Sequence, residues 1–174
     1  MKTEIDKIIN FEENKDFEKA FNAYNNLYSL NKSDFEVWKN FFFFLWIIIE
    51  YMPNDFIEKI KRESKLKEMF TDGLTFFSLN PEFNFIAGYV MSIFPYEFGD
   101  FDEYEIKSSE LLAKAKNLEP NNEIYKMVVL GNSDDKNSAN YLDARINPQP
   151  KVIEKYKGSG LLNQYFRQGL YRTE

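Results

Sequence analysis

Apolar residues recur at intervals of three and four along much of this chain, the pattern of helices that bury one side. Residues 17–30 show it most clearly, and residues 3–13, 83–94 and 104–118 repeat it. In the clearest segment the apolar positions are Phe17, Ala20, Phe21, Tyr24, Leu27 and Leu30. No stretch has the strict alternation that is typical of a half-buried strand. The pattern therefore predicts an all-α protein.

Capping residues and prolines are predicted to separate these helices. Asp16 and Asp34 are expected to be N-caps, and Asp34 begins a helix expected at residues 35–52. The polar stretch at residues 61–65 predicts a kink or loop within the helical segment 56–79. The other predicted caps and breaks are Pro53, Pro81, Pro95, Asn121, Pro148 and Ser159. After residue 130 we expect only short helices, one of them at residues 138–145.

Nine consecutive apolar residues at 41–49 form the one candidate for a membrane-spanning segment. A helix that crosses a membrane needs about 20 such residues. A shorter helix that is apolar on every side is instead typical of the centre of a globular array. We therefore expect residues 41–49 to be a buried helix, and we expect no membrane partner.

Three helical segments end with a leucine and a polar residue, and a new apolar segment follows each of them. These leucines are Leu30, Leu79 and Leu118. The outline is typical of stacked helix hairpins, in which each unit buries its apolar face against a neighbour. It predicts a single all-α domain over residues 1–174, with hairpins at 3–130 and capping helices at 131–174.

Residues 14–31 resemble the second half of a tetratricopeptide repeat, and residues 87–94 and 111–122 resemble parts of a further unit. The matching positions are Phe17, Ala20, Tyr24 and, in the next unit, Trp38. The leucine ends are spaced 49 (79 − 30) and 39 (118 − 79) residues apart, whereas the family repeats about every 34. The resemblance implies a right-handed superhelix of antiparallel hairpins whose surfaces bind protein segments. It carries over no catalytic residue.

The composition lacks the side chains on which most enzyme mechanisms depend. The chain has no histidine and no cysteine, so the commonest general base, the commonest zinc ligands and disulfide bonds are all missing. Only carboxylates could bind a metal with charge, and they favour hard cations. We therefore expect no enzyme, no cofactor and no metal. Residues 1–7 lack the apolar core of a signal peptide, so we expect a cytoplasmic protein.

The charge of the chain narrows the class of partner. The formal net charge is −6 and the isoelectric point is about 4.9. Such a charge disfavours nucleic acids and anionic membranes as partners. It favours another protein that is basic.

An acidic and aromatic segment at residues 96–104 is the main candidate for partner binding. We expect a loop there, followed by the helix at 104–118. Interleaved aromatic rings and carboxylates suit an interface with a basic partner, although a solvated loop is the alternative. The segment lacks the spacing of a calcium-binding EF-hand. The candidate residues are Tyr96, Glu97, Asp100, Phe101, Asp102, Glu103 and Tyr104.

Residues 160–172 resemble the C-terminal ends of some small bacterial toxin-immunity proteins, although an amphipathic capping helix explains them as well. Together with the acidic charge, the resemblance predicts an immunity protein that binds and neutralises a basic toxin. Two alternatives remain open. One is an adaptor or secretion chaperone, similar to tetratricopeptide-repeat proteins, that holds a peptide segment. The other is a hydrolase that uses carboxylates.

Overall fold

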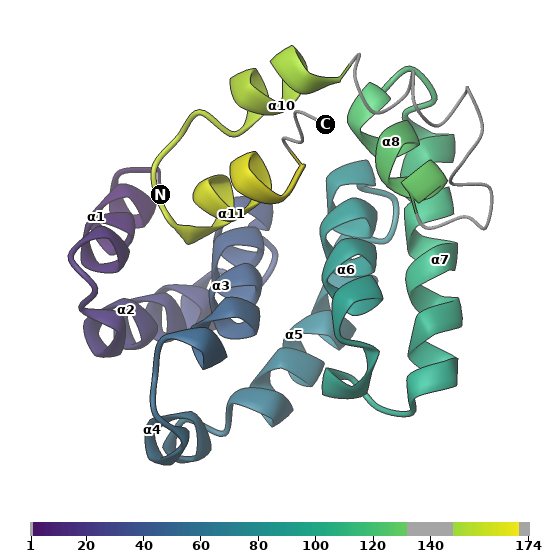
Figure 1. The fold of residues 1–174 in the computed structure, drawn as a ribbon. Helices are drawn as coiled ribbons and strands as arrows, with labels where there is room; N and C mark the ends of the chain where they lie inside the picture. The colour runs from purple at the N-terminus through teal and green to yellow at the C-terminus, as the bar shows by residue number, and fades with distance from the viewer. Residues whose placement is uncertain (1, 132–147, 171–174) are drawn as a thin grey trace. The chain divides into compact units, whose positions relative to one another are not determined.

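The computed structural model describes residues 2–131 and 148–170, and every regular element in these ranges is a helix (Figure 1). The predicted all-α class is therefore confirmed, while the helix expected at residues 138–145 lies outside the described ranges. The α-helices are α1 (Lys2–Glu13), α2 (Phe17–Leu30), α3 (Phe35–Ile47), α4 (Asn54–Lys59), α5 (Arg62–Phe77), α6 (Pro81–Ile93), α7 (Phe101–Leu118), α8 (Glu123–Gly131), α10 (Gln149–Lys155) and α11 (Leu161–Leu170). Two short 3₁₀ helices are η1 (Ile48–Glu50) and η2 (Pro95–Glu97).

Two predicted N-caps differ in what their carboxylates do. Asp34 caps α3, because its Oδ1 accepts a hydrogen bond from the Val37 amide at 3.0 Å. That bond satisfies one of the amides that the first turn of a helix leaves without a partner. Asp16 precedes α2 as predicted, but its carboxylate pairs with Lys19 and makes no capping hydrogen bond. The capping prediction is therefore confirmed at Asp34 and wrong in its chemistry at Asp16.

Two other helices begin next to their predicted boundaries. Asn122, rather than Asn121, caps α8: its Oδ1 accepts hydrogen bonds from two amides of the first turn, at 3.1 and 3.3 Å. Asn80 caps α6 in the same way, and Pro81 is the first residue of α6. Proline is well tolerated there because the amide proton that it lacks would have had no intrahelical partner.

The long segments predicted at 35–52 and 56–79 are both interrupted. The first remains α-helical only to Ile47 and continues as η1. The second breaks as predicted, because Lys61 adopts a φ of 50°, in the left-handed region. The break is shorter than expected, since α5 begins at Arg62.

The described chain divides into two compact units. The first comprises Met1–Phe77 and Gly158–Gln164, and the second comprises Ser78–Lys157 and Tyr165–Glu174. In the first unit α1 packs on α2, α2 on α3 and α3 on α5; in the second α6 packs on α7 and α7 on α8 (Figure 1). This packing of chain neighbours is compatible with a helical repeat. That residues 1–174 fold as a single domain stays a prediction.

Helix α3 forms the core of the first unit. Every side chain from Phe41 to Ile48 is buried, and only the last residue of the predicted apolar run, Ile49, is exposed. A helix that is apolar on all sides is stable only where neighbours cover all of it. Within residues 2–131 and 148–170, no helix has both the length and the apolar character needed to span a membrane.

A buried arginine holds the end of α3. Arg62 is only 3% exposed, and it donates from Nε to the Leu45 carbonyl at 2.7 Å and from Nη2 to the Trp46 carbonyl at 3.0 Å. These carbonyls belong to the last turns of α3, where a helix carries partial negative charge and leaves carbonyls without intrahelical partners. The guanidinium therefore fixes the start of α5 to the end of α3.

Stacked aromatic rings fill the second unit. Phe85 of α6 stacks on Tyr125 of α8 with ring centroids 4.6 Å apart, and Tyr156 stacks on Phe166 of α11 at 5.0 Å. All four side chains are almost fully buried. Helix α7 lies along α6 in this unit (Figure 1). Its buried side chains are Ser108, Leu111, Leu112 and Ala115.

Candidate protein-binding surface

The predicted binding segment lies in the second unit and is more ordered than a loop. Tyr96 and Glu97 belong to η2, and Asp100 is the N-cap of α7. The carboxylate of Asp100 accepts a hydrogen bond from the Glu103 amide at 3.1 Å. Because of this cap, α7 begins at Phe101 and not at residue 104. The loop expected over residues 96–103 is therefore confined to residues 98–100.

The four aromatic rings of this segment divide into two pairs. Tyr96 is 58% exposed and Phe101 is 51% exposed. Phe98 is buried, and Tyr104 stacks on it with ring centroids 5.9 Å apart. Gly99 leaves room for the Tyr104 ring, because a Cβ at this position would lie 2.5 Å from the ring. Tyr104 therefore packs on its own chain, whereas Tyr96 and Phe101 face solvent.

Four carboxylates surround the exposed rings: Asp100, Asp102, Glu103 and Glu105, all of them exposed. None forms an ion pair with another residue in the described part of the chain. The sequence has no lysine or arginine between Lys67 and Lys107. Carboxylates in the first turn also complement the partial positive charge of the helix N-terminus. The start of α7 is therefore a negative surface without a compensating cation among the described residues.

Ile106 belongs to this surface, although it is one of the apolar residues of the helix predicted at residues 104–118. It is 63% exposed. At 100° per residue it lies about 140° from Leu111 and about 120° from Leu112 around the helix axis, and both leucines are buried. A helical projection of residues 101–118 places Ile106 away from the two buried leucines.

We call this surface the acidic face. Its members come from η2 and the first two turns of α7, and they combine exposed apolar side chains with unpaired carboxylates. They are Tyr96, Asp100, Phe101, Asp102, Glu103, Glu105 and Ile106. In the described ranges, no three or more His, Cys, Asp or Glu side chains are grouped as metal ligands would be. The chemistry that the acidic face offers is contact with positive charge and apolar surface.

No protein-family model matches this chain. The comparisons with curated proteins and with solved structures give no match either.

A second surface feature lies in the first unit, where a mainly apolar groove of about 580 Å³ runs between α1 and α2. Leu30, at the end of α2, is 82% exposed on it. The two charged side chains that line it, Glu4 and Lys7, pair with each other at 2.9 Å. We call it the Leu30 groove; its lining residues are Glu4, Lys7, Ile8, Asn10, Phe11, Ala23, Asn26, Leu27 and Leu30.

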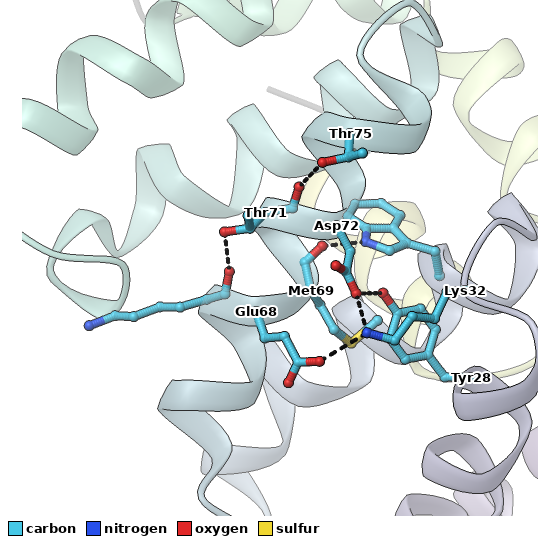
Figure 2. Close-up of polar contacts among 9 residues, drawn as sticks. Tyr28, Lys32, Glu68, Met69, Thr71, Asp72 and Thr75 are labelled. Atoms are coloured by element: carbon cyan, nitrogen blue, oxygen red, sulfur yellow. Dashed lines mark hydrogen bonds and ion pairs between the residues drawn. The ribbon is translucent and has the colours of Figure 1, made fainter.

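A smaller hollow of about 420 Å³ extends from Leu30 to the exposed ring of Phe76 on α5. Beside it, Lys32 bonds to Glu68 at 3.1 Å and to Asp72 at 2.8 Å (Figure 2). These contacts join the connection between α2 and α3 to α5, so both walls of the hollow are held in place.

The carboxylate of Asp72 is the centre of this network (Figure 2). It also accepts a hydrogen bond from the Tyr28 hydroxyl at 2.8 Å. Partial burial raises the pKa of Asp72, but the hydrogen bonds from Lys32 and Tyr28 outweigh it and leave the pKa below its usual value. Asp72 therefore stays ionised and keeps both partners. The sequence pattern did not single out these residues, because they are 40 or more positions apart.

Proposed function

We propose that this chain is a non-catalytic protein that binds a basic protein partner through the acidic face. The observation that carries the proposal is the presence of exposed Phe101 and Ile106 among carboxylates without ion-pair partners in the described chain. Exposed apolar anchors can fill pockets of a partner, while uncompensated charge draws a basic surface toward them.

In its most concrete form, the proposal is an immunity protein that neutralises a bacterial toxin by binding it. A basic toxin, such as a nuclease, carries positive charge where it contacts its own anionic substrate. A negative surface competes for that region, and electrostatic steering speeds the encounter by one or more orders of magnitude at low salt. The acidic composition and the resemblance of residues 160–172 support this version.

We also propose that the hairpins stack in the right-handed manner of tetratricopeptide repeats. Two motif positions support it: Ala20 and Tyr24 are completely buried, as the small and aromatic residues of the motif require. Gly88 supports it as well, because α6 and α7 approach each other closely at this residue.

The Leu30 groove favours a second candidate function, an adaptor or secretion chaperone that holds a peptide segment. Helix-in-groove recognition uses an apolar groove between helices that accepts the apolar side of a peptide. The volume of the groove lies within the usual range of binding pockets. Its charges cancel, so this candidate predicts an apolar rather than a basic partner segment.

The main proposal is tested by charge reversal on the acidic face. A partner is first captured on the immobilised chain from a lysate of the source cells, and Asp102→Lys with Glu105→Lys is then compared with the original chain. We expect association at low ionic strength to slow by about tenfold or more and its salt dependence to flatten, because steering requires opposite charges. Stopped-flow or surface-based kinetics measures both effects. Asp100 is left unchanged because it caps α7.

The matched control is Glu18→Lys with Glu58→Lys, which changes the charge equally at exposed positions of the first unit. We expect less than about a twofold change there, since the effect of a charge decays within about a Debye length. If both double variants slow association equally, the slowing is due to the net charge of the chain. That result would contradict the proposal that the acidic face binds the partner. The immunity version further requires that the partner be toxic when expressed alone and harmless when co-expressed with this chain.

The apolar anchors give a separate prediction. Phe101→Ala and Ile106→Ser should accelerate dissociation of the captured partner by about tenfold or more while leaving the melting temperature nearly unchanged, because these side chains face solvent. Tyr104→Ala should instead lower the melting temperature, because its ring packs on Phe98. Kinetics and thermal unfolding of the three variants check both statements. Unchanged dissociation in the first two variants would remove Phe101 and Ile106 from the interface.

A further inference from the structure

A short segment near the end of the chain is held by a buried carboxylate close to its beginning. Glu12 of α1 is only 5% exposed. Its Oε2 accepts a hydrogen bond from the Leu161 amide at 2.8 Å, and its Oε1 accepts one from the Tyr24 hydroxyl at 2.8 Å. The neighbouring Glu13 accepts a hydrogen bond from the Gly160 amide at 3.1 Å. Residues 158–164 are thereby part of the first unit, about 150 positions from α1 in the sequence.

The backbone of Gly160 makes this approach possible. Its φ is +89°, in the region that favours glycine, and a Cβ there would lie 2.9 Å from Glu12 Oε2. The start of α11 therefore presents its amides directly to the two carboxylates, where partial positive charge is available. The sequence pattern predicts Ser159 as the cap of this helix; instead, carboxylates of α1 accept hydrogen bonds from the Gly160 and Leu161 amides.

We propose that Glu12 attaches residues 160–164 to α1 in a pH-dependent way, and that this attachment weakens as the pH rises. This device is independent of the proposed binding function. It rests on a carboxylate that is buried without a cation, since residues 158–164 contain no charged side chain. Burial of a charge without a counter-charge is costly even where hydrogen bonds are made.

The groups around Glu12 determine the direction of the effect. Burial is the largest influence and raises the pKa of Glu12 to about 7, while hydrogen bonds from Leu161 and Tyr24 oppose it and the charge of Glu13 adds to it. On α3, which also packs on α1, the charged residues Glu36 and Lys39 pair with each other at 2.7 Å. No cation among the described residues pairs with Glu12.

Release of the segment returns Glu12 to solvent, where its pKa takes the ordinary value of 4.5. Below that value Glu12 is protonated whether the segment is held or released. Between 4.5 and about 7 the released form loses its proton first, so rising pH favours release. Above about 7 both forms are ionised and the balance no longer changes. The hold is therefore strongest in acid and is weakened by the time the pH reaches neutrality.

Hydrogen exchange of the amides of residues 160–164 tests the proposal in the intact chain. After correction for the intrinsic rate, we expect the opening equilibrium constant to rise roughly 70-fold between pH 5 and pH 8, from the two pKa values. In Glu12→Gln the same amides should show no such rise, whatever their absolute protection. Asp6→Asn is the matched control, because Asp6 is an exposed carboxylate of the same helix that makes no hydrogen bond to residues 160–164 in the described chain, and its removal should keep the pH dependence.

A third variant distinguishes the proposed pH effect from a general loss of stability. Tyr24→Phe keeps the ring but removes one hydrogen bond to Glu12, so it should raise the pKa of Glu12 further and extend the pH dependence to higher pH. The proposal would be overturned if the opening equilibrium constant of the original chain did not change with pH. It would also be overturned if Glu12→Gln kept the same pH dependence as the original chain. Loss of the pH dependence in Asp6→Asn would show that the effect does not belong to Glu12 and would overturn the proposal as well.

Discussion

Replacing Trp38 with alanine should lower the free energy of unfolding by about 4 kcal/mol, the usual range for truncating a buried aromatic residue. Trp38 is completely buried, stacks on Phe42 with ring centroids 4.6 Å apart, and donates from Nε1 to the Met69 carbonyl at 2.7 Å. Truncation removes the contacts of the ring and leaves the carbonyl of α5 without this donor. Urea unfolding followed by circular dichroism measures the change.

Two further variants help to separate the causes of the stability loss expected in Trp38→Ala. Trp38→Phe keeps an aromatic ring but loses the hydrogen bond to the Met69 carbonyl, and it should cost about 1–3 kcal/mol for the lost bond and the volume that the smaller ring leaves unfilled. Leu30→Ala is the control for size, because that side chain is 82% exposed and should cost less than about 1 kcal/mol. A loss below about 1 kcal/mol in Trp38→Ala would show that α3 is not the core that stabilises the first unit.

The second large effect is expected at Gly88, where α6 meets α7. A Cβ at this position would lie 2.9 Å from Leu112 Cγ and 3.0 Å from both the Leu112 amide nitrogen and the Ser108 carbonyl oxygen. Two of these three atoms belong to the backbone of α7, which cannot move aside without separating the helices. We expect Gly88→Ala to cost about 2 kcal/mol and Gly88→Val about 3 kcal/mol or more, measured by chemical unfolding.

Gly169→Ala is the matched control for this substitution. Gly169 lies within α11, and a Cβ there would meet its nearest neighbours, Tyr89 and Tyr165, at 3.5 and 3.7 Å, which are ordinary contact distances. Alanine should therefore be neutral or stabilise the helix by up to about 1 kcal/mol. Tolerance of both substitutions would mean that α6 and α7 do not need their close contact.

Local sequence pattern predicted the candidate surface only in part. The density of carboxylates and rings at residues 96–104 identified the segment, because composition is visible without a fold. Which ring faces solvent was not visible: Phe101 and Tyr104 look equivalent in the sequence, yet only Tyr104 packs on Phe98. Ile106 was missed because the apolar spacing was counted without a projection around the helix axis.

The sequence by itself determined the all-α class, the buried helical run at residues 41–48 and the cap at Asp34, because helix periodicity and capping depend on residues within a few positions of one another. Only the tertiary structure decided that Glu12 meets the amide of Leu161 and that Arg62 binds the carbonyls that end α3. In the sequence, Glu12 is one of several acidic residues and Arg62 is part of a polar stretch. Their roles arise from which helices pack together, and that choice is made by the summed burial of apolar surface along the whole chain.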